Sequence, residues 1–115
     1  MEKSQKELLE TKTKYELNFT ETITDEYKKR QAIYFFENGY GISIINIKNH
    51  NGAFLSYTKS EEEYEIAVLQ KRENGSSSIT YETPITDNVI GYLKIEGVYK
   101  IMEEVEKLKK VLKKK

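Results

Sequence analysis

Few residue types in this sequence could carry chemistry. His50 is the single histidine, and it lies in the run Asn49-His50-Asn51-Gly52, whose residue types are typical of a turn. A zinc site would need further ligands at suitable spacing, and no neighbouring residue supplies them. The sequence has no cysteine, which excludes disulfides, thiolate metal sites and cysteine nucleophiles. We therefore interpret His50 as a solvated turn residue and predict no metal site.

The densest acidic group is formed by Glu61, Glu62, Glu63 and Glu65. Neighbouring side chains on a strand point to opposite faces, so these carboxylates should not converge on one ion or pair for acid–base chemistry. Their spacing also differs from that of a calcium-binding loop. Two interpretations remain open: a solvated acidic loop, or a contact patch for a basic partner.

Two motifs of small residues have structural explanations. Ser76-Ser77-Ser78 has no base partner nearby in the sequence and is typical of a flexible turn. Gly39-Tyr40-Gly41 precedes no predicted helix, so it lacks the helix N-terminus that phosphate-binding loops use. Because neither a catalytic constellation nor a ligand set is present, we predict that the protein is not an enzyme and has no cofactor.

The charges are balanced overall but unevenly distributed. The chain has 19 basic and 19 acidic residues. Residues 15–93 have seven basic and twelve acidic side chains, whereas residues 94–115 have eight lysines and four glutamates. Such asymmetry suggests charged partners. The C-terminal lysines could contact phosphates, but they suit a solvated helix end equally well, and we do not expect direct nucleic-acid binding.

The hydrophobic pattern predicts a small antiparallel sheet. Side chains alternate between apolar and polar from Tyr15 to Thr20, which favours a half-buried strand, and residues 24–30 are expected to form a polar connection. Asn38-Gly39 separates two runs rich in β-forming residues and is the residue pair preferred in tight hairpins. Alternation breaks after Ile44, which suggests burial on both faces or a bulge. The segments expected in the sheet are 15–20, 31–36, 40–48, 64–71 and 78–82.

The last predicted element is an amphipathic helix. Its apolar residues recur at spacings of three and four, namely Val98, Ile101, Met102, Val105, Leu108 and Leu112. Thr86-Asp87 is interpreted as a helix cap that leads into residues 88–93. A sheet with an apolar face needs a cover, and the C-terminal helix is the obvious candidate. We therefore predict an α+β fold, in which a single antiparallel, meander-like sheet of about five strands is covered by a C-terminal amphipathic helix.

The chain length of 115 residues predicts one domain. Residues 1–13 lack a sustained apolar stripe and are expected to form a weakly ordered N-terminal arm, so the single α+β domain is assigned to residues 14–115. No segment approaches the roughly 18 consecutive apolar residues that suggest a membrane span. Met1 to Glu10 mixes Lys and Glu, unlike a signal peptide. We expect a cytoplasmic protein with no membrane partner.

Three stretches of the sequence resemble a group of small phage-encoded proteins. They are Phe36-Glu37-Asn38-Gly39-Tyr40-Gly41, Tyr64-Glu65-Ile66-Ala67-Val68-Leu69 and residues 81–93, which read YETPITDNVIGYL. That group has a glycine-rich loop before the second stretch, and here the corresponding segment, Ser56 to Glu63, has no glycine. The group has no settled biochemical function, so no functional residues carry over. The resemblance implies a virus or mobile element that infects bacteria.

Small phage proteins without catalytic residues often bind and block a host protein, including defence nucleases. By this analogy, we expect a phage-type accessory protein that inhibits a host or defence protein, in an anti-CRISPR-like manner, by stoichiometric binding in the cytoplasm of a bacterial cell. An acidic surface facing the basic nucleic-acid channel of a nuclease would be the mechanism. The predicted contact residues are Tyr57, Glu61, Glu62, Glu63 and Glu65.

Two alternative functions use other parts of the sequence. A small nucleic-acid-binding module would use the C-terminal lysines and the tyrosines of the sheet. A structural or assembly protein would act through oligomerisation, at a sheet edge or through the helix. The oligomeric state is left open by the sequence.

Overall fold

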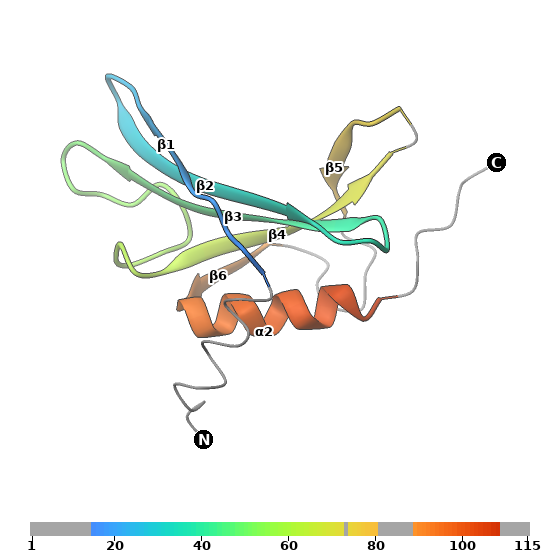
Figure 1. Ribbon diagram of the computed structural model, residues 1–115. Helices are drawn as coiled ribbons and strands as arrows, with labels where there is room; N and C mark the ends of the chain where they lie inside the picture. The colour runs from blue at the N-terminus through green and yellow to red at the C-terminus, as the bar shows by residue number, and fades with distance from the viewer. Residues whose placement is uncertain (1–14, 73, 81–88, 109–115) are drawn as a thin grey trace.

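The computed structural model describes residues 15–72, 74–80 and 89–108. These residues form six strands and one helix: β1 (Thr20–Ile23), β2 (Tyr27–Phe35), β3 (Tyr40–Asn49), β4 (Tyr64–Lys71), β5 (Ser77–Ile79), β6 (Ile90–Leu93) and α2 (Ile95–Glu106). The strands make one sheet, and α2 lies across one of its faces (Figure 1). The predicted α+β class, with an antiparallel sheet and one C-terminal helix, is confirmed.

The sheet is a meander from β1 to β5, with every neighbouring pair antiparallel. Beyond β4 its edge is shared by two short strands. The C-terminal half of β4 pairs with β5, where Leu69 is opposite Ile79. The N-terminal half pairs with β6, where Tyr64 is opposite Leu93. Residues paired across an antiparallel ladder lie on the same face, so the register assigns each side chain to the face that α2 covers, the inner face, or to the opposite, outer face.

The hydrophobic core lies between the inner face and α2. Alternate residues of β3 and β4 contribute Ile42, Ile44, Ile66 and Val68, and α2 contributes Val98, Met102 and Val105. All seven side chains are almost completely buried. Burial of an aliphatic side chain of this size contributes about 1.5–3 kcal/mol, so this contact holds the helix to the sheet.

The β2–β3 hairpin also fixes the end of α2. Gly39 has a φ of 90°, which lets the chain turn tightly between the strands. Beside it, the Asn38 side-chain amide donates to the carbonyls of Val105 at 2.8 Å and Leu108 at 3.1 Å. The last carbonyls of a helix have no partner within the helix. Asn38 therefore lies in the hairpin turn and also donates hydrogen bonds to the free carbonyls at the C-terminal end of α2.

Two predicted boundaries near the N-terminus are wrong. Residues 15–19 are not a strand, and β1 begins only at Thr20. Tyr15 is instead buried, packs edge-on against Tyr34 and Phe36, and donates its hydroxyl to Glu106 Oε1 at 2.6 Å. Burial and this carboxylate raise the pKa of Tyr15 well above its usual range.

The predicted polar connection at residues 24–30 is also wrong for most of its length. β2 begins at Tyr27, and residues 27–30 are paired with β3, from Tyr27 opposite Asn49 to Arg30 opposite Asn46. Pairing on both sides overrides the weak strand preference of a lysine-rich segment. The period-2 pattern is invisible there because long charged side chains occupy both faces.

The third correction concerns the approach to α2. The Thr86-Asp87 cap lies outside the described residues, but the segment it was expected to lead into contains β6, an extended strand rather than a helix. Tyr92, whose φ of 57° is in the left-handed region, lies where the register between β4 and β6 shifts, and α2 begins at Ile95. β5 is likewise shorter than the predicted strand 78–82, of which residues 81 and 82 lie outside the described part.

Candidate functional site

The segment that contains the predicted contact residues is fixed to the end of β3. β4 pairs with β3 only as far as Ile45, and the loop after β3 occupies the remaining space. Phe54 forms a bridge with Lys48, and the Leu55 amide donates to the Ile47 carbonyl at 2.9 Å. The loop is therefore an extension of the sheet, and its position is set by backbone hydrogen bonds.

Buried polar side chains hold this loop from within. Asn46, which is 3% exposed, donates to the carbonyls of Ser60 at 3.0 Å and Glu63 at 2.8 Å. The Ser56 hydroxyl accepts from the Ile47 amide at 3.0 Å. Buried hydrogen-bonded groups of this kind are costly to leave unpaired, so they specify one loop conformation.

Two of the four predicted carboxylates are used inside the loop. Glu63 Oε1 accepts from the Lys59 amide at 2.8 Å, and Glu65 Oε1 accepts from the Tyr57 amide at 2.9 Å. Hydrogen bonds to a charged acceptor are stronger than neutral ones. Glu63 and Glu65 therefore shape the loop, and their charges are partly satisfied by backbone dipoles.

The other two carboxylates project from the loop into solvent. Glu61 lies 3.5 Å from Lys48 Nζ, and Glu62 lies 4.0 Å from Lys94 Nζ. Their side chains are 64% and 87% exposed, respectively. Such exposed pairs contribute about 0–1 kcal/mol. Each projecting carboxylate thus has a nearby lysine, which reduces the acidic character of this surface.

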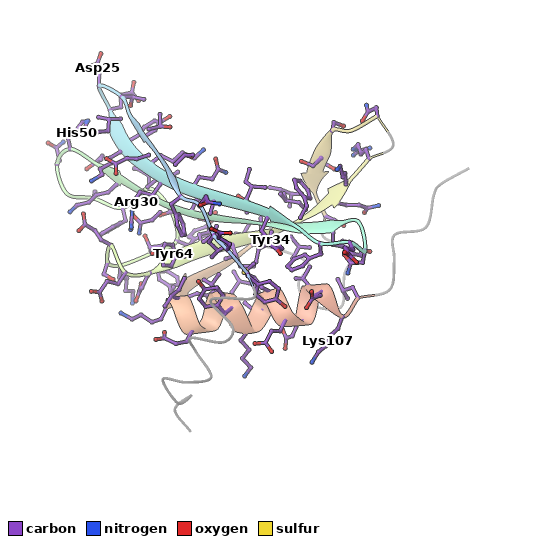
Figure 2. The ribbon with its side chains drawn as sticks, in the orientation of Figure 1. Asp25, Arg30, Tyr34, His50, Tyr64 and Lys107 are labelled. Carbon is purple, nitrogen blue, oxygen red and sulfur yellow. The ribbon has the colours of Figure 1, made fainter. Side chains whose placement is uncertain are left out.

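An open hollow lies beside these carboxylates, between the inner face and the start of α2. It is lined by Arg30, Glu61, Glu62, Tyr64, Lys94, Ile95 and Glu96. The Arg30 guanidinium lies 5.7 Å from the centre of the Tyr64 ring and donates to the Glu61 carbonyl (Figure 2). Two cations and three carboxylates line the hollow, so it suits contact with mixed polar side chains better than capture of one ion.

The predicted contact residues are divided between the two faces of the sheet. Glu61 and Glu62 border the hollow on the inner side. Glu65 is opposite Ile45, so it belongs to the outer face, and Tyr57 lies beside it. Tyr57 is exposed and its carbonyl accepts from the Tyr92 amide at 2.8 Å. Whether any of these residues contacts a partner stays a prediction.

The outer face carries an apolar surface that residue-by-residue reasoning about charges missed. It includes side chains from β2, β3, β4 and β5 and from the loop, namely Ile33, Phe35, Ile45, Ile47, Leu55, Leu69 and Ile79. Of these, Ile33, Phe35, Leu55 and Ile79 are exposed. The sequence signal was the run Ile44-Ile45-Asn46-Ile47, in which apolar residues occupy both faces of one strand.

Phe35 is held in place on this surface by its neighbours. A methyl group added at Gly41 would lie 2.5 Å from Phe35 Cδ1, so the ring rests directly over this glycine. The Lys71 ammonium lies 5.6 Å from the centre of the same ring, within the range of a cation–π contact. The aromatic side chain is therefore presented on a rigid strand rather than on a mobile loop.

His50 lies in the turn after β3, at the end of the sheet that is farthest from α2 and next to the β1–β2 turn (Figure 2). Its Nε2 is 2.7 Å from the Thr24 carbonyl, which links this turn to the β1–β2 turn. Within the described residues, no group of three or more His, Asp or Glu side chains is placed to hold a metal ion.

Comparisons of the chain with protein families, with curated proteins and with solved structures found no match. Among the described residues there is no helix with the length and hydrophobicity needed to cross a bilayer.

Proposed function

We propose that this protein is a stoichiometric protein-binding domain, and that it contacts its partner through the outer face of the sheet. In its most specific form, the proposal is a phage-type accessory protein that inhibits a host or defence protein of a bacterial cell, in an anti-CRISPR-like manner. Inhibition would follow from occupation of a partner surface, without chemistry by this chain.

The exposed apolar surface of the outer face is the observation that carries this proposal. Soluble monomers rarely expose contiguous apolar patches larger than a few hundred Å², and larger patches commonly mark interaction sites. Ile33 and Phe35 are on β2 and Ile79 is on β5, and the row from Phe35 to Ile79 crosses Gly41 of β3 and Leu69 of β4. A surface on paired strands is already ordered before binding, which lowers the entropic cost of association.

The loop adds a second, polar region at the edge of that surface. Tyr57 is exposed beside Glu65, and tyrosine is well suited to binding surfaces because it is large, rigid and amphipathic. Glu61 and Glu62 would then lie at the periphery, where charged groups affect the association rate more than the affinity. The acidic segment is thus a secondary contact in this proposal.

The experiment compares two exposed isoleucines on opposite faces. Ile33 is 52% exposed on the outer face, and Ile23 is 66% exposed on the inner side of β1, opposite Lys28. Tagged wild-type protein, Ile33→Glu and Ile23→Glu are used to capture proteins from a bacterial lysate, after circular dichroism has shown equal folding. We expect a partner that binds wild type and Ile23→Glu at a one-to-one ratio but not Ile33→Glu. Equal capture by all three proteins would refute the outer face as the contact surface.

A further inference from the structure

The two faces of the sheet differ in how their lysines are compensated. Three ion pairs join described residues: Lys28–Glu21, Lys48–Glu61 and Lys94–Glu62. Lys28 and Lys48 are opposite each other on the inner face, and Lys94 directly precedes α2. On the outer face, neither Lys29 nor Lys71 forms an ion pair with another described residue. Of the four lysines in the described strands, the two without an ion pair are therefore both on the outer face.

The two outer-face lysines stand at opposite ends of the apolar surface. Lys29 is opposite Ile47, near the end of β3. Lys71 lies at the other end, where its amide donates to the Gly39 carbonyl and its ammonium lies over Phe35. From Lys29 to Phe35 the strand advances by six residues, which is about 20 Å at roughly 3.3 Å per residue. The ammonium groups of Lys29 and Lys71 thus lie at the two ends of the apolar surface.

Acidic groups on this face are few and already engaged. Within the described strands, Glu65 is the single carboxylate assigned to the outer face, and it accepts from the Tyr57 amide. A second copy of this chain would therefore bring lysines against lysines. In addition, the β4–β5 hairpin rises from the sheet on the side away from α2 (Figure 1), which opposes flat packing of one sheet on another and leaves room for a single rod-like element.

We infer that the outer face binds an acidic amphipathic segment of a partner protein. The apolar side chains of that segment pack on Ile33, Phe35 and Ile79, and its carboxylates reach Lys29 and Lys71. A helix covers the distance of about 20 Å from Lys29 to Phe35, beside whose ring the Lys71 ammonium lies, in about 13 residues at 1.5 Å per residue. This inference rests on the proposed function and specifies the chemistry of the partner.

The test uses a labelled synthetic peptide whose binding is followed by fluorescence anisotropy. The probe is a helix-forming peptide of about 18 residues with a leucine stripe flanked by glutamates, and a matched peptide has lysine in place of each glutamate. We expect the acidic peptide to bind wild type, more weakly as salt rises, and the basic peptide not to bind. The double variant Lys29→Glu/Lys71→Glu should bind the acidic peptide at least tenfold more weakly and gain affinity for the basic one.

A matched control uses the neighbouring lysines of the inner face. Lys28→Glu/Lys48→Glu makes the same charge change on the opposite side of the sheet and should leave binding of the acidic peptide within twofold of wild type. Ile33→Glu should abolish binding, while Ile23→Glu should not. Circular dichroism verifies that each variant folds.

Several outcomes would overturn the inference. If the acidic peptide does not bind wild type, the inference is wrong. The proposed function would still be supported if a lysate protein is captured in a manner that depends on Ile33, and the partner would then have another chemistry. Self-association in sedimentation equilibrium that is lost in Ile33→Glu would identify a second copy as the occupant. Flotation with phosphatidylglycerol vesicles, or binding of a single-stranded oligonucleotide that depends on Lys29 and Lys71, would identify a membrane or a nucleic acid instead.

Discussion

The two faces of the sheet come from the same strands but differ in cover and in charge. On the inner face, Ile42 and Ile44 are completely buried beneath α2, and the lysines have carboxylate partners. On the outer face, Ile33 and Ile79 remain exposed, and Lys29 and Lys71 have no carboxylate partner among the described residues. The sheet has more apolar surface than one helix covers, and we propose that a partner covers the rest.

The largest expected effect is that of an acidic residue placed in the core. Val105 is completely buried between α2 and the inner face. An unpaired buried carboxylate costs several kcal/mol, a large part of a typical total stability of about 5–15 kcal/mol. Val105→Asp should therefore unfold the protein or lower its melting temperature by tens of degrees in thermal denaturation.

An aspartate placed on the outer face instead provides the contrast. Ile33→Asp places the carboxylate in solvent, so the melting temperature should change by only a few degrees. If Val105→Asp melted like wild type, α2 would not pack on the sheet as described. If Ile33→Asp were as damaging as Val105→Asp, the outer face would be part of the core.

The next largest effect is expected at the contact between Phe35 and Gly41. A methyl group at residue 41 would lie 2.5 Å from Phe35 Cδ1 and 2.8 Å from the Tyr34 carbonyl oxygen. Because the carbonyl cannot move aside as a side chain can, Gly41→Ala should destabilise the protein by about 1–3 kcal/mol in urea denaturation. Gly97→Ala is the control, since its methyl group would meet the Leu93 side chain at 3.1 Å and alanine favours a helix by about 1 kcal/mol. Equal stability of Gly41→Ala and wild type would show that Phe35 does not rest over this glycine.

A smaller effect is expected at the link between the hairpin and α2. Asn38→Ala removes the amide that binds the last carbonyls of α2 and the oxygen that accepts from the Tyr40 amide at 3.0 Å. The loss should be about 1–2 kcal/mol by urea denaturation. Asn51→Ala, in a turn where the Asn51 side chain has no hydrogen bond to another described residue, should stay within about 0.5 kcal/mol of wild type. If the Asn38→Ala variant were as stable as wild type, Asn38 would not cap the C-terminal end of α2.

The smallest effect separates the two kinds of carboxylate in the acidic loop. Glu61→Gln/Glu62→Gln removes two exposed charges and should leave the melting temperature within about two degrees of wild type. Glu63→Gln/Glu65→Gln weakens two charge-assisted hydrogen bonds to loop amides and should lower it by several degrees. If Glu61→Gln/Glu62→Gln lowered the melting temperature more than Glu63→Gln/Glu65→Gln, the projecting carboxylates would be the ones that hold the loop. With a captured partner, slower association of Glu61→Gln/Glu62→Gln at low salt would test the predicted acidic contact.

The fold was predictable where local signals and periodicity agreed. Asn38-Gly39 fixed the β2–β3 hairpin, and the spacing of Val98, Met102 and Val105 predicted the helix and its buried face. Elements that depend on distant pairing were missed. β6 is a strand because it pairs with β4, and Tyr27 to Arg30 is a strand because β1 and β3 flank it. Neither cause is visible in a short window of sequence.

The candidate site was predictable only in part. The sequence identified the carboxylates, but it could not show that Glu63 and Glu65 bind loop amides or that Lys48 and Lys94 lie beside Glu61 and Glu62. The outer face was harder to predict, because its residues come from four strands and a loop. Their shared face follows from the register of pairing, which a single sequence does not contain.

The central claim is that a partner binds the outer face, and isoleucine-methyl NMR tests it most directly. The captured partner, or the acidic peptide, is added to protein labelled at its isoleucine δ1 methyl groups. We predict that the signals of Ile33, Ile45, Ile47 and Ile79 shift on binding, while those of Ile23, Ile42, Ile44 and Ile66 do not. Shifts confined to the second group, or no shift of Ile33 and Ile79 at saturation, would contradict the account.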